Sequence, residues 1–310
     1  VNMPTYKPTL NYNKKQLKRA MEAISNAKKP LLYIGGGAIL SNCGYEIRDL
    51  AKKLNIPAVE TLMARGVMGD ENPLFFGMLG MHGEYAANMA AHETDLLISL
   101  GARFDDRVTG RLDEFASKAK VIHIDIDPTS IAKLVVADYP IVGDLKLTVQ
   151  AMIEDAENYE INDFSNWVEL LKDYREKEPL RYIDTDDLIK PQWPIQRVGK
   201  ILGDNAIIST DVGQHQMWTA QFFPFSYPRQ WITSGGLGTM GFGLPAALGA
   251  ARAFKGTNRV VVNFTGDGSI LMNIQELMTC SEYELPVINI VLNNNYLVMV
   301  RQWQTMFYEN

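Results

Sequence analysis

Oxygen donors follow two apolar runs near the C-terminal end of the sequence. Asp267, flanked by glycines, comes directly after the run 260–265, and a pair of asparagines ending at Asn294 comes after the run 287–292. If these runs are neighbouring parallel strands, their carboxyl ends meet at the edge where α/β sheets bind ligands. A carboxylate and an amide oxygen suit Mg²⁺, and the glycines let the backbone approach a diphosphate. The spacing therefore predicts a metal site that neutralises a diphosphate.

Magnesium prefers six oxygen ligands in an octahedron. Besides the two side chains, we expect the backbone carbonyl of Tyr296, two diphosphate oxygens and a water to complete this set, with Gly268 and Ser269 beside the diphosphate. The alternative is a plain strand-to-helix turn followed by an ordinary asparagine loop. Either half alone favours that alternative, whereas the two halves together favour the site.

Alternating strand-like and helix-like segments must position these residues. In the first half, apolar runs at 31–34, 96–100 and 121–126 alternate with helical patterns at 45–54 and 145–153. Such alternation predicts βαβ units and a parallel sheet.

The second half repeats the alternation from residue 195 onward. The expected strands are 206–209, 231–233, 260–264 and 287–292, and the expected helices are 195–202, the segment from 214, 242–253 and 274–283. We therefore predict an α/β chain with two doubly wound parallel-sheet domains. The expected ranges are a first domain over 1–155, a charged linker with one surface helix over 156–190, and a second domain over 191–310.

Composition excludes several classes of protein. The net charge of −6, without long basic runs, argues against nucleic acid and anionic membranes as partners. The apolar runs are too short to span a bilayer. Cys43 and Cys280 are far apart and lack metal-ligand spacing, so a cytoplasmic protein is expected. The chain starts at Val1 without methionine and ends after an aromatic stretch, which suggests an excised fragment.

Two further runs carry a resemblance to a known family. The sequences TDVGQHQMW at 210–218 and GGLGTMGFGLP at 235–245, together with the Gly-Asp-Gly and Asn-Asn pattern, resemble acetolactate synthase catalytic subunits, which depend on thiamine diphosphate. The resemblance covers nearly the whole chain. It implies a central FAD-binding domain and a C-terminal domain for thiamine diphosphate and Mg²⁺.

The resemblance assigns roles in the second domain. It places the diphosphate at the start of a helix, where free N–H groups favour anions, near Val212, Gly213, Gln214 and His215. It also makes Gly238 a cofactor-binding residue. It makes Met240 the wedge that holds the cofactor bent, with core packing as the alternative.

By the same resemblance, Met299 and Trp303, four residues apart, line the substrate channel if their segment is helical. The family has glycine before this methionine where the chain has Val298. A β-branched residue there could crowd the cofactor or forbid an unusual backbone angle.

The resemblance also implies a flavin site in the first domain. Gly35, Gly36 and Gly37 follow a strand without forming GxGxxG, so alone they are a weak signal. The other residues that resemble the family's flavin-binding segments are Thr61, Leu62, Met63, Gly80, Met81, His82, Gly101, Arg103, Asp105, Arg107, Val108, Asp125, Ile126 and Asp144. In this set, we expect Arg103 to pair with the flavin diphosphate and Asp125 with ribose hydroxyls, unless both are solvated loop charges.

Arg107 has a second expected role. The family places this arginine toward the entry channel, where it could hold the carboxylate of a 2-keto acid; a surface salt bridge is the alternative. His82 and His123 are interpreted as flavin-side or core residues.

The implied reaction decarboxylates pyruvate and joins the remaining two-carbon unit to pyruvate or 2-ketobutyrate, the first common step of branched-chain amino-acid biosynthesis. The products are 2-acetolactate or 2-aceto-2-hydroxybutyrate, and FAD has no net redox role. A homodimer or tetramer with a small regulatory subunit is implied. The glutamate that protonates the cofactor lies on the family's N-terminal domain, so the isolated chain is expected to be inactive.

Two alternatives remain open. One is another thiamine diphosphate enzyme, of the glyoxylate carboligase or pyruvate oxidase type, against which Arg107 and the pair Gln302 and Trp303 argue. The other is a catalytically silent module that keeps the cofactor folds as a scaffold.

Overall fold

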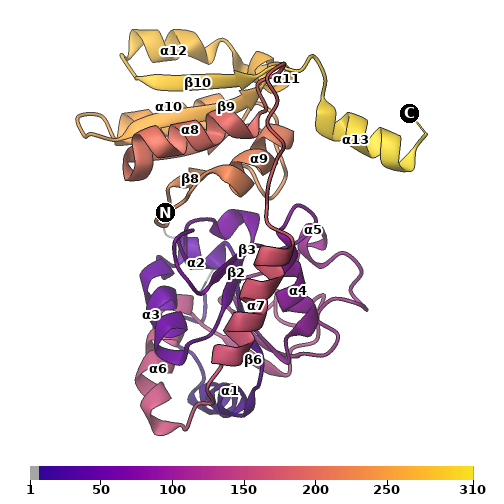
Figure 1. Cartoon of the computed structure of the whole chain (residues 1–310). Helices are drawn as coiled ribbons and strands as arrows, with labels where there is room; N and C mark the ends of the chain where they lie inside the picture. Colours follow the sequence, from indigo (N-terminus) through magenta and orange to yellow (C-terminus); the bar gives the residue numbers. More distant parts are fainter. Residues whose placement is uncertain (1–6, 310) are drawn as a thin grey trace. The chain divides into compact units, whose positions relative to one another are not determined.

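The computed structural model describes residues 7–309. The chain divides into two units, Val1–Leu180 and Arg181–Asn310, and each is described by itself (Figure 1). Among the described residues, no helix is both long and apolar enough to cross a membrane.

The first unit is built on a six-stranded sheet in which every strand pairing is parallel. Its strands are β1 (Pro30–Ile34), β2 (Ala58–Glu60), β3 (Phe75–Met78), β4 (Leu96–Leu100), β5 (Lys120–Asp125) and β6 (Tyr139–Val142). They lie in the order β3-β2-β1-β4-β5-β6, which is the order of doubly wound dinucleotide-binding folds. The predicted parallel sheet is confirmed. All residues of β1 and β4 are buried, as expected for strands covered on both faces.

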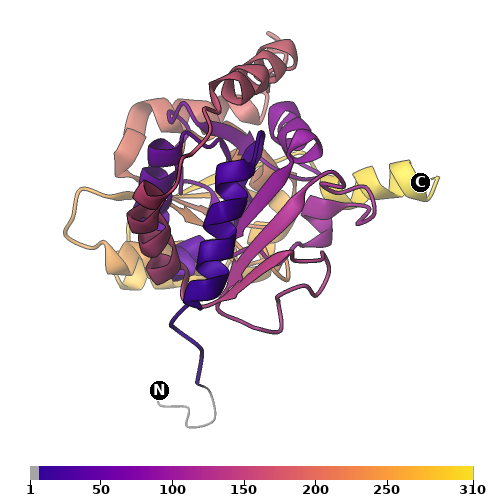
Figure 2. The same cartoon turned by 90° about the horizontal axis from the view of Figure 1, so that it is seen from below.

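Helices accompany this sheet. They are α1 (Lys14–Asn26), α2 (Gly37–Leu40), α3 (Gly44–Leu54), α4 (Tyr85–Glu93), α5 (Asp106–Thr109), α6 (Leu145–Asp155) and α7 (Ser165–Lys177), with 3-10 turns η1 (Leu62–Ala64) and η2 (Ala156–Asn158). Asn13 begins α1 by accepting hydrogen bonds from the N–H groups of Lys15 and Gln16. One face of α1 is buried, and the helix lies along the sheet near β6 (Figure 2).

Helix α7 differs from the expected surface helix of a linker. Its residues Trp167 and Leu171 are buried in the core of the first unit. The indole Nε1 of Trp167 donates to the carbonyl of Pro30 at 2.9 Å, and α7 packs against α4. This apolar face places the helix in the first unit, so the expected linker range 156–190 is too long.

The second unit contains a four-stranded parallel sheet. Its strands are β7 (Ala206–Thr210), β8 (Trp231–Ile232), β9 (Val260–Gly266) and β10 (Val287–Leu292), in the order β10-β9-β7-β8. Its helices are α8 (Gln192–Leu202), α9 (Gln214–Phe222), α10 (Gly243–Ala253), α11 (Asp267–Ile270), α12 (Glu276–Glu282) and α13 (Val298–Phe307), with 3-10 turns η3 (Gly203–Asn205) and η4 (Leu271–Asn273).

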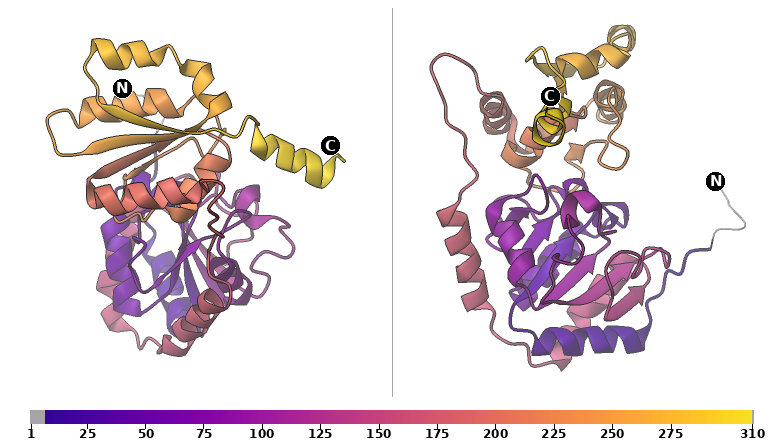
Figure 3. Two further views of the ribbon diagram at one scale, coloured as in Figure 1. Left: turned by 45° about the horizontal axis from the view of Figure 1, so that its top comes forward. Right: turned by 90° about the vertical axis from the view of Figure 1, so that its right-hand side faces the viewer.

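The chain changes direction across this second sheet between β7 and β9. From β7 it runs outward to β8 through α9, then returns past β7 to β9 through α10. Helices α8 and α9 therefore cover one face and α10 the other (Figure 3). The segments after β7 and β9 part toward opposite faces and leave a crevice, the position at which doubly wound sheets bind ligands.

Candidate functional site

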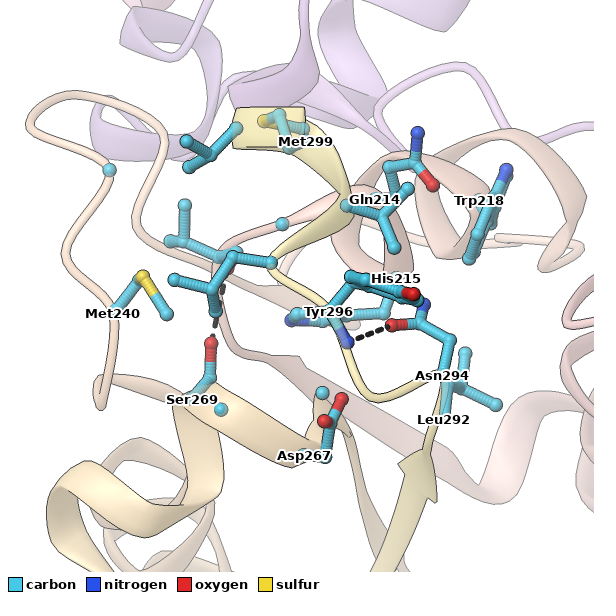
Figure 4. A pocket seen from close by; sticks show the side chains of 18 residues that line it. Gln214, His215, Trp218, Met240, Asp267, Ser269, Leu292, Asn294, Tyr296 and Met299 are labelled. Atoms are coloured by element: carbon cyan, nitrogen blue, oxygen red, sulfur yellow. Dashed lines mark hydrogen bonds between the residues drawn. The ribbon is translucent and has the colours of Figure 1, made fainter. Parts of the chain in front are cut away.

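A pocket of about 240 Å³ lies at this crevice in the second unit. Its walls are the segments that follow β7, β9 and β10, together with the loop that precedes α10 (Figure 4). The pocket brings together most residues predicted for the second domain: Val212, Gly213, Gln214, His215, Gly238, Met240, Asp267, Gly268, Ser269, Asn294, Tyr296 and Met299.

The imidazole of His215 is the most deeply buried titratable side chain in the pocket. The residue lies in the first turn of α9 and is 7% exposed. Its ring occupies the space beside two glycines, since a Cβ on Gly213 would lie 2.7 Å from Cε1 and a Cβ on Gly266 3.0 Å from Nδ1. Burial lowers the pKa of His215 to about 4, although a hydrogen bond to the Asp211 backbone and the charge of Asp267 act in the opposite direction. The ring is therefore neutral at pH 7.

Atom Nε2 of His215 is buried without a hydrogen-bond partner among the described residues. A buried polar atom without a partner is costly, and a ligand that supplies one is correspondingly favoured. The first-turn N–H groups of α9 add an anion-attracting helix end at the same wall.

The two predicted metal ligands enter the pocket from neighbouring strands. Asp267 is the first residue of α11, directly after β9, and Asn294 follows β10 (Figure 4). The Asn294 Oδ1 accepts a hydrogen bond from the N–H of Tyr296 at 3.1 Å. Because an amide oxygen has two lone pairs, it can keep this bond and still face a cation.

No cluster of three or more acidic, histidine or cysteine side chains suited to a metal occurs in the part of the chain that the structure describes. The donor set at Asp267 and Asn294 is thus one carboxylate and one neutral amide. Such a set fits Mg²⁺ only if a ligand brings further oxygens, as a diphosphate does.

Met240 lies opposite these groups on a turn that is held at both ends (Figure 4). The N–H of Thr239, just before it, donates to Ser234 Oγ at 3.0 Å. The N–H of Gly241, just after it, donates to Asp211 Oδ1 at 2.6 Å. Gly238 and Gly241 have positive φ angles of 65° and 86°, which explains glycine on both sides of the methionine.

Helix α13 contributes only its first turn to the pocket. Met299 lines the cavity, whereas Trp303, one turn later, does not and instead packs on Phe307 with ring centroids 4.9 Å apart. Val298 begins the helix, and the left-handed residue of this segment is Asn295, with φ 59°. The β-branched side chain therefore occupies a helical position that it tolerates.

In the first unit, the residues predicted to bind flavin all follow the carboxyl ends of strands. Glycines 35–37 follow β1, residues 61–63 follow β2, residues 80–82 follow β3, and the segment 101–108 follows β4. Asp125 ends β5, and Asp144 follows β6 as the N-cap of α6. One sheet edge therefore collects the complete set, and the strand order reverses direction between β1 and β4.

The three glycines after β1 have different surroundings. A Cβ on Gly35 or Gly37 would lie 2.3 Å or 2.7 Å from the backbone of Gly101, so these two are required by the contact between loops. A Cβ on Gly36 would meet only the side chain of Met63, at 3.1 Å. Of the three, Gly36 is the one whose space a ligand could share.

Charged residues at this edge already have local partners. Arg103 pairs with Asp105, and Arg107 pairs with Asp106 at 3.4 Å; both arginine side chains are more than 60% exposed. Asp105 accepts from the N–H of Arg107 at 3.1 Å, and Asp144 accepts from the N–H of Leu147 at 3.0 Å, so both carboxylates cap helices.

Asp125 accepts from the N–H of Asp127 at 2.9 Å, and burial raises the pKa of Asp125. This hydrogen bond uses Oδ1 of Asp125, so Oδ2 can accept from another partner. His82 is half-buried, and burial together with the charge of Arg107 lowers the pKa of its imidazole.

Comparison with known proteins accounts for both units. Residues 17–152 match the model of the thiamine pyrophosphate enzyme central domain, and residues 211–310 match that of the thiamine pyrophosphate enzyme C-terminal TPP binding domain. The chain belongs to the thiamine pyrophosphate enzymes.

Among relatives in this family, the acetolactate synthase isozyme 3 large subunit of Escherichia coli is 46% identical over 99% of the chain. The acetolactate synthase large subunits of Haemophilus influenzae and Mycobacterium tuberculosis are also 46% identical over 99% of the chain. The chain spans 54%, 54% and 50% of these three relatives, about half of their length. It is a homologue of acetolactate synthase large subunits, as the resemblance predicted.

The structure adds pocket residues that sequence reasoning did not assign. Trp218, Leu292, Leu297 and Val300 also line the cavity. Leu297 explains Gly268, because a Cβ there would lie 2.6 Å from Leu297 Cδ2. Their signal in the sequence was position alone, since each lies within a few residues of a predicted ligand.

A buried ion-pair cluster in the first unit also went unpredicted. Glu60, at the end of β2, is fully buried, and its carboxylate accepts from Arg65 Nη1 at 3.1 Å and from the N–H groups of Gly66 and Met68 at 3.1 Å and 2.5 Å. Arg65 also donates to both carboxylate oxygens of Asp70. A glutamate at the end of an apolar strand was the available signal. Because Glu60 bonds to Arg65 and Gly66, the cluster joins the two ends of the segment that contains residues 61–63.

Proposed function

We propose that this chain is the cofactor-binding part of an acetolactate synthase, which decarboxylates pyruvate and joins the two-carbon product to pyruvate or 2-ketobutyrate. The single observation that carries the proposal is the pocket at the crevice of the second unit. There the unpartnered Nε2 of His215, the start of α9, and the pair Asp267 and Asn294 converge.

These residues fit thiamine diphosphate and Mg²⁺. The diphosphate would lie against the start of α9, within reach of Val212, Gly213, Gln214 and His215. Gly268 and Ser269 would border it from α11, because the hydroxyl of Ser269 already donates to the carbonyl of Val212 at 3.2 Å. Asp267, Asn294 and the carbonyl of Tyr296 would hold the metal ion.

When bound, thiamine diphosphate supplies the electron sink for decarboxylation of a 2-keto acid. The chain's own residues place and enclose it. Met240 would support the cofactor in a bent conformation, while Leu292, Leu297 and Val300 would add apolar surface to the pocket walls. Met299 would border the substrate.

Arg107 and Trp303 complete the proposal as substrate-side residues. A guanidinium binds a carboxylate through two parallel hydrogen bonds, which suits a 2-keto acid. The ion pair of Arg107 with Asp106 is largely exposed and contributes little, so a substrate carboxylate can replace it.

FAD is proposed for the carboxyl edge of the sheet in the first unit. Support comes from the reversal of strand order between β1 and β4, from the space at Gly36 beside Met63, and from the exposed Arg103. Its role there would be structural. A full protein with a homodimeric or tetrameric catalytic subunit and a small regulatory subunit is proposed by analogy with the relatives. We expect the 310-residue chain to bind thiamine diphosphate through the pocket of the second unit.

Calorimetric titration of this chain with thiamine diphosphate tests the proposal directly. We expect binding in the presence of Mg²⁺ and its loss when EDTA replaces the metal. Absence of binding at millimolar cofactor would favour a silent scaffold module. In the full-length protein, acetolactate formation from pyruvate is expected without a change of the flavin spectrum; flavin reduction during turnover would favour an oxidase.

A further inference from the structure

Asp211 forms hydrogen bonds to three segments of the second unit. The residue follows β7 and is 1% exposed. Its Oδ1 accepts from the N–H of Gly241 at 2.6 Å and from the N–H of Val212 at 3.2 Å. Its Oδ2 accepts from the hydroxyl of Thr265 at 3.3 Å. Asp211 is not among the residues that line the pocket.

Each of these donors adjoins a different part of the proposed site. Val212 begins the turn that leads into α9, the wall for the diphosphate. Gly241 directly follows Met240, the proposed support of the bent cofactor. Thr265 is two residues before Asp267, a proposed metal ligand. One carboxylate therefore connects the diphosphate wall, the Met240 turn and the end of β9.

The Met240 turn is held from its other side as well. The carbonyl of Gly241 accepts from Nδ2 of Asn273 at 2.7 Å. Because Oδ1 of Asp211 serves two amides at once, a shift of the Met240 turn away from Val212 would break at least one of these bonds. Buried N–H groups left without an acceptor are costly, so such shifts are opposed.

We propose that Asp211 is a positioning residue that fixes Met240 relative to the diphosphate-binding turn. The proposal rests on the proposed function, because Met240 matters only if thiamine diphosphate binds. Removing both acceptor oxygens should release the Met240 turn and weaken cofactor binding. Replacing the carboxylate with an amide should do neither, since one oxygen can still accept from both N–H groups.

A merely structural role would lower stability without affecting Met240 or the cofactor. Gln230 provides the matched control, because it is fully buried in the same unit and accepts from the N–H of Ser226 at 2.9 Å. It does not line the pocket. Gln230→Ala should therefore destabilise the unit yet leave cofactor affinity unchanged.

The experiment compares wild type, Asp211→Asn, Asp211→Ala and Gln230→Ala. Calorimetry measures thiamine diphosphate affinity with Mg²⁺, and NMR of methionine methyl groups, with Met240 assigned by Met240→Leu, measures the order of the turn. We expect Asp211→Ala to raise Kd about tenfold or more and to broaden or shift the Met240 signal. For Asp211→Asn and Gln230→Ala, both Kd and the Met240 signal should stay near the wild-type values.

The outcomes separate the two proposals. If wild type fails to bind, the proposed function is wrong. If wild type binds and Asp211→Ala matches it in both affinity and Met240 signal, the role of Asp211 is wrong. If Asp211→Ala does not fold, amide hydrogen exchange in the wild-type chain tests the role of Asp211 instead. The amide of Gly241 must then be protected in the absence of cofactor, and rapid exchange there would overturn the proposal.

Discussion

Acidification should destabilise the second unit through His215. The imidazole must stay neutral while buried, because burial lowers its pKa from 6.5 to about 4. A group whose folded pKa is lowered binds more protons in the unfolded chain at intermediate pH, so stability falls as the pH falls. The window for this loss runs from about pH 6.5 down to about pH 4.

The magnitude follows from the two pKa values. At pH 8 both states hold the ring neutral and the contribution is nearly zero. At pH 5 the unfolded ring is almost fully protonated while the folded ring is mostly neutral, which removes about 2 kcal/mol of unfolding free energy. Below pH 4 the loss levels off at about 3 kcal/mol, a large share of a typical domain's stability.

Urea unfolding of the cofactor-free chain between pH 5 and pH 8, followed by tryptophan fluorescence, measures this effect. His215→Gln serves as the reference because glutamine does not titrate, whereas Asp211 and other buried acids titrate in both proteins. The difference in pH dependence between the two chains should therefore approach about 2 kcal/mol at pH 5. An NMR titration giving His215 a pKa of 6.5 or higher, or identical pH profiles for both chains, would refute the reasoning.

Four further substitutions test residues of both units. In α10, Gly243→Ala should cost about 2 kcal/mol or more in urea unfolding, because its Cβ would lie 2.6 Å from Asn263 Oδ1 and 2.6 Å from the Asp211 amide. Gly249→Ala in the same helix, with no atom within 4 Å of the new Cβ, should instead gain up to about 1 kcal/mol. Glu60→Ala should cost the first unit about 3–5 kcal/mol, measured by its melting temperature, because it leaves the buried amides of Gly66 and Met68 without their acceptor and removes one of the two carboxylates that bond to Arg65; an unchanged melting temperature would contradict this. Asp267→Asn should weaken Mg²⁺-dependent thiamine diphosphate binding about tenfold or more in calorimetry while leaving the unfolding curve in place, and equal affinity would exclude a metal role.

The fold was largely predictable because buried strands and helices require apolar residues at regular positions in the sequence. The runs at 260–264 and 287–292 form adjacent parallel strands, with Phe264 paired to Ile290. Placing Asp267 and Asn294 at one edge then required only the rule that parallel strands end on the same side. The pocket confirms that the two residues lie in one cavity.

Other features depended on contacts that sequence spacing does not encode. Met299 and Trp303 share a helix face, yet only the first reaches the pocket, because the helix leaves the cavity after one turn. The helical pattern around Trp167 was visible, but its partner, the carbonyl of Pro30, lies 137 residues away. Asp211 stood within a recognised motif, yet the amide of Gly241, 30 residues later, gives its carboxylate a role.

Each unit has a hydrophobic core made from its own residues. One core runs from Leu17 to Leu171, and a second draws on residues between Ile207 and Leu285. In a calorimetric scan, the chain should therefore melt in two transitions. A ligand that binds one folded unit adds to the unfolding free energy of that unit, by about 2.7 kcal/mol when its free concentration is a hundred times Kd. The melting temperature of that unit alone then rises. Thiamine diphosphate should then move one peak and FAD the other, so that a single thermogram reports the occupancy of both proposed cofactor sites independently.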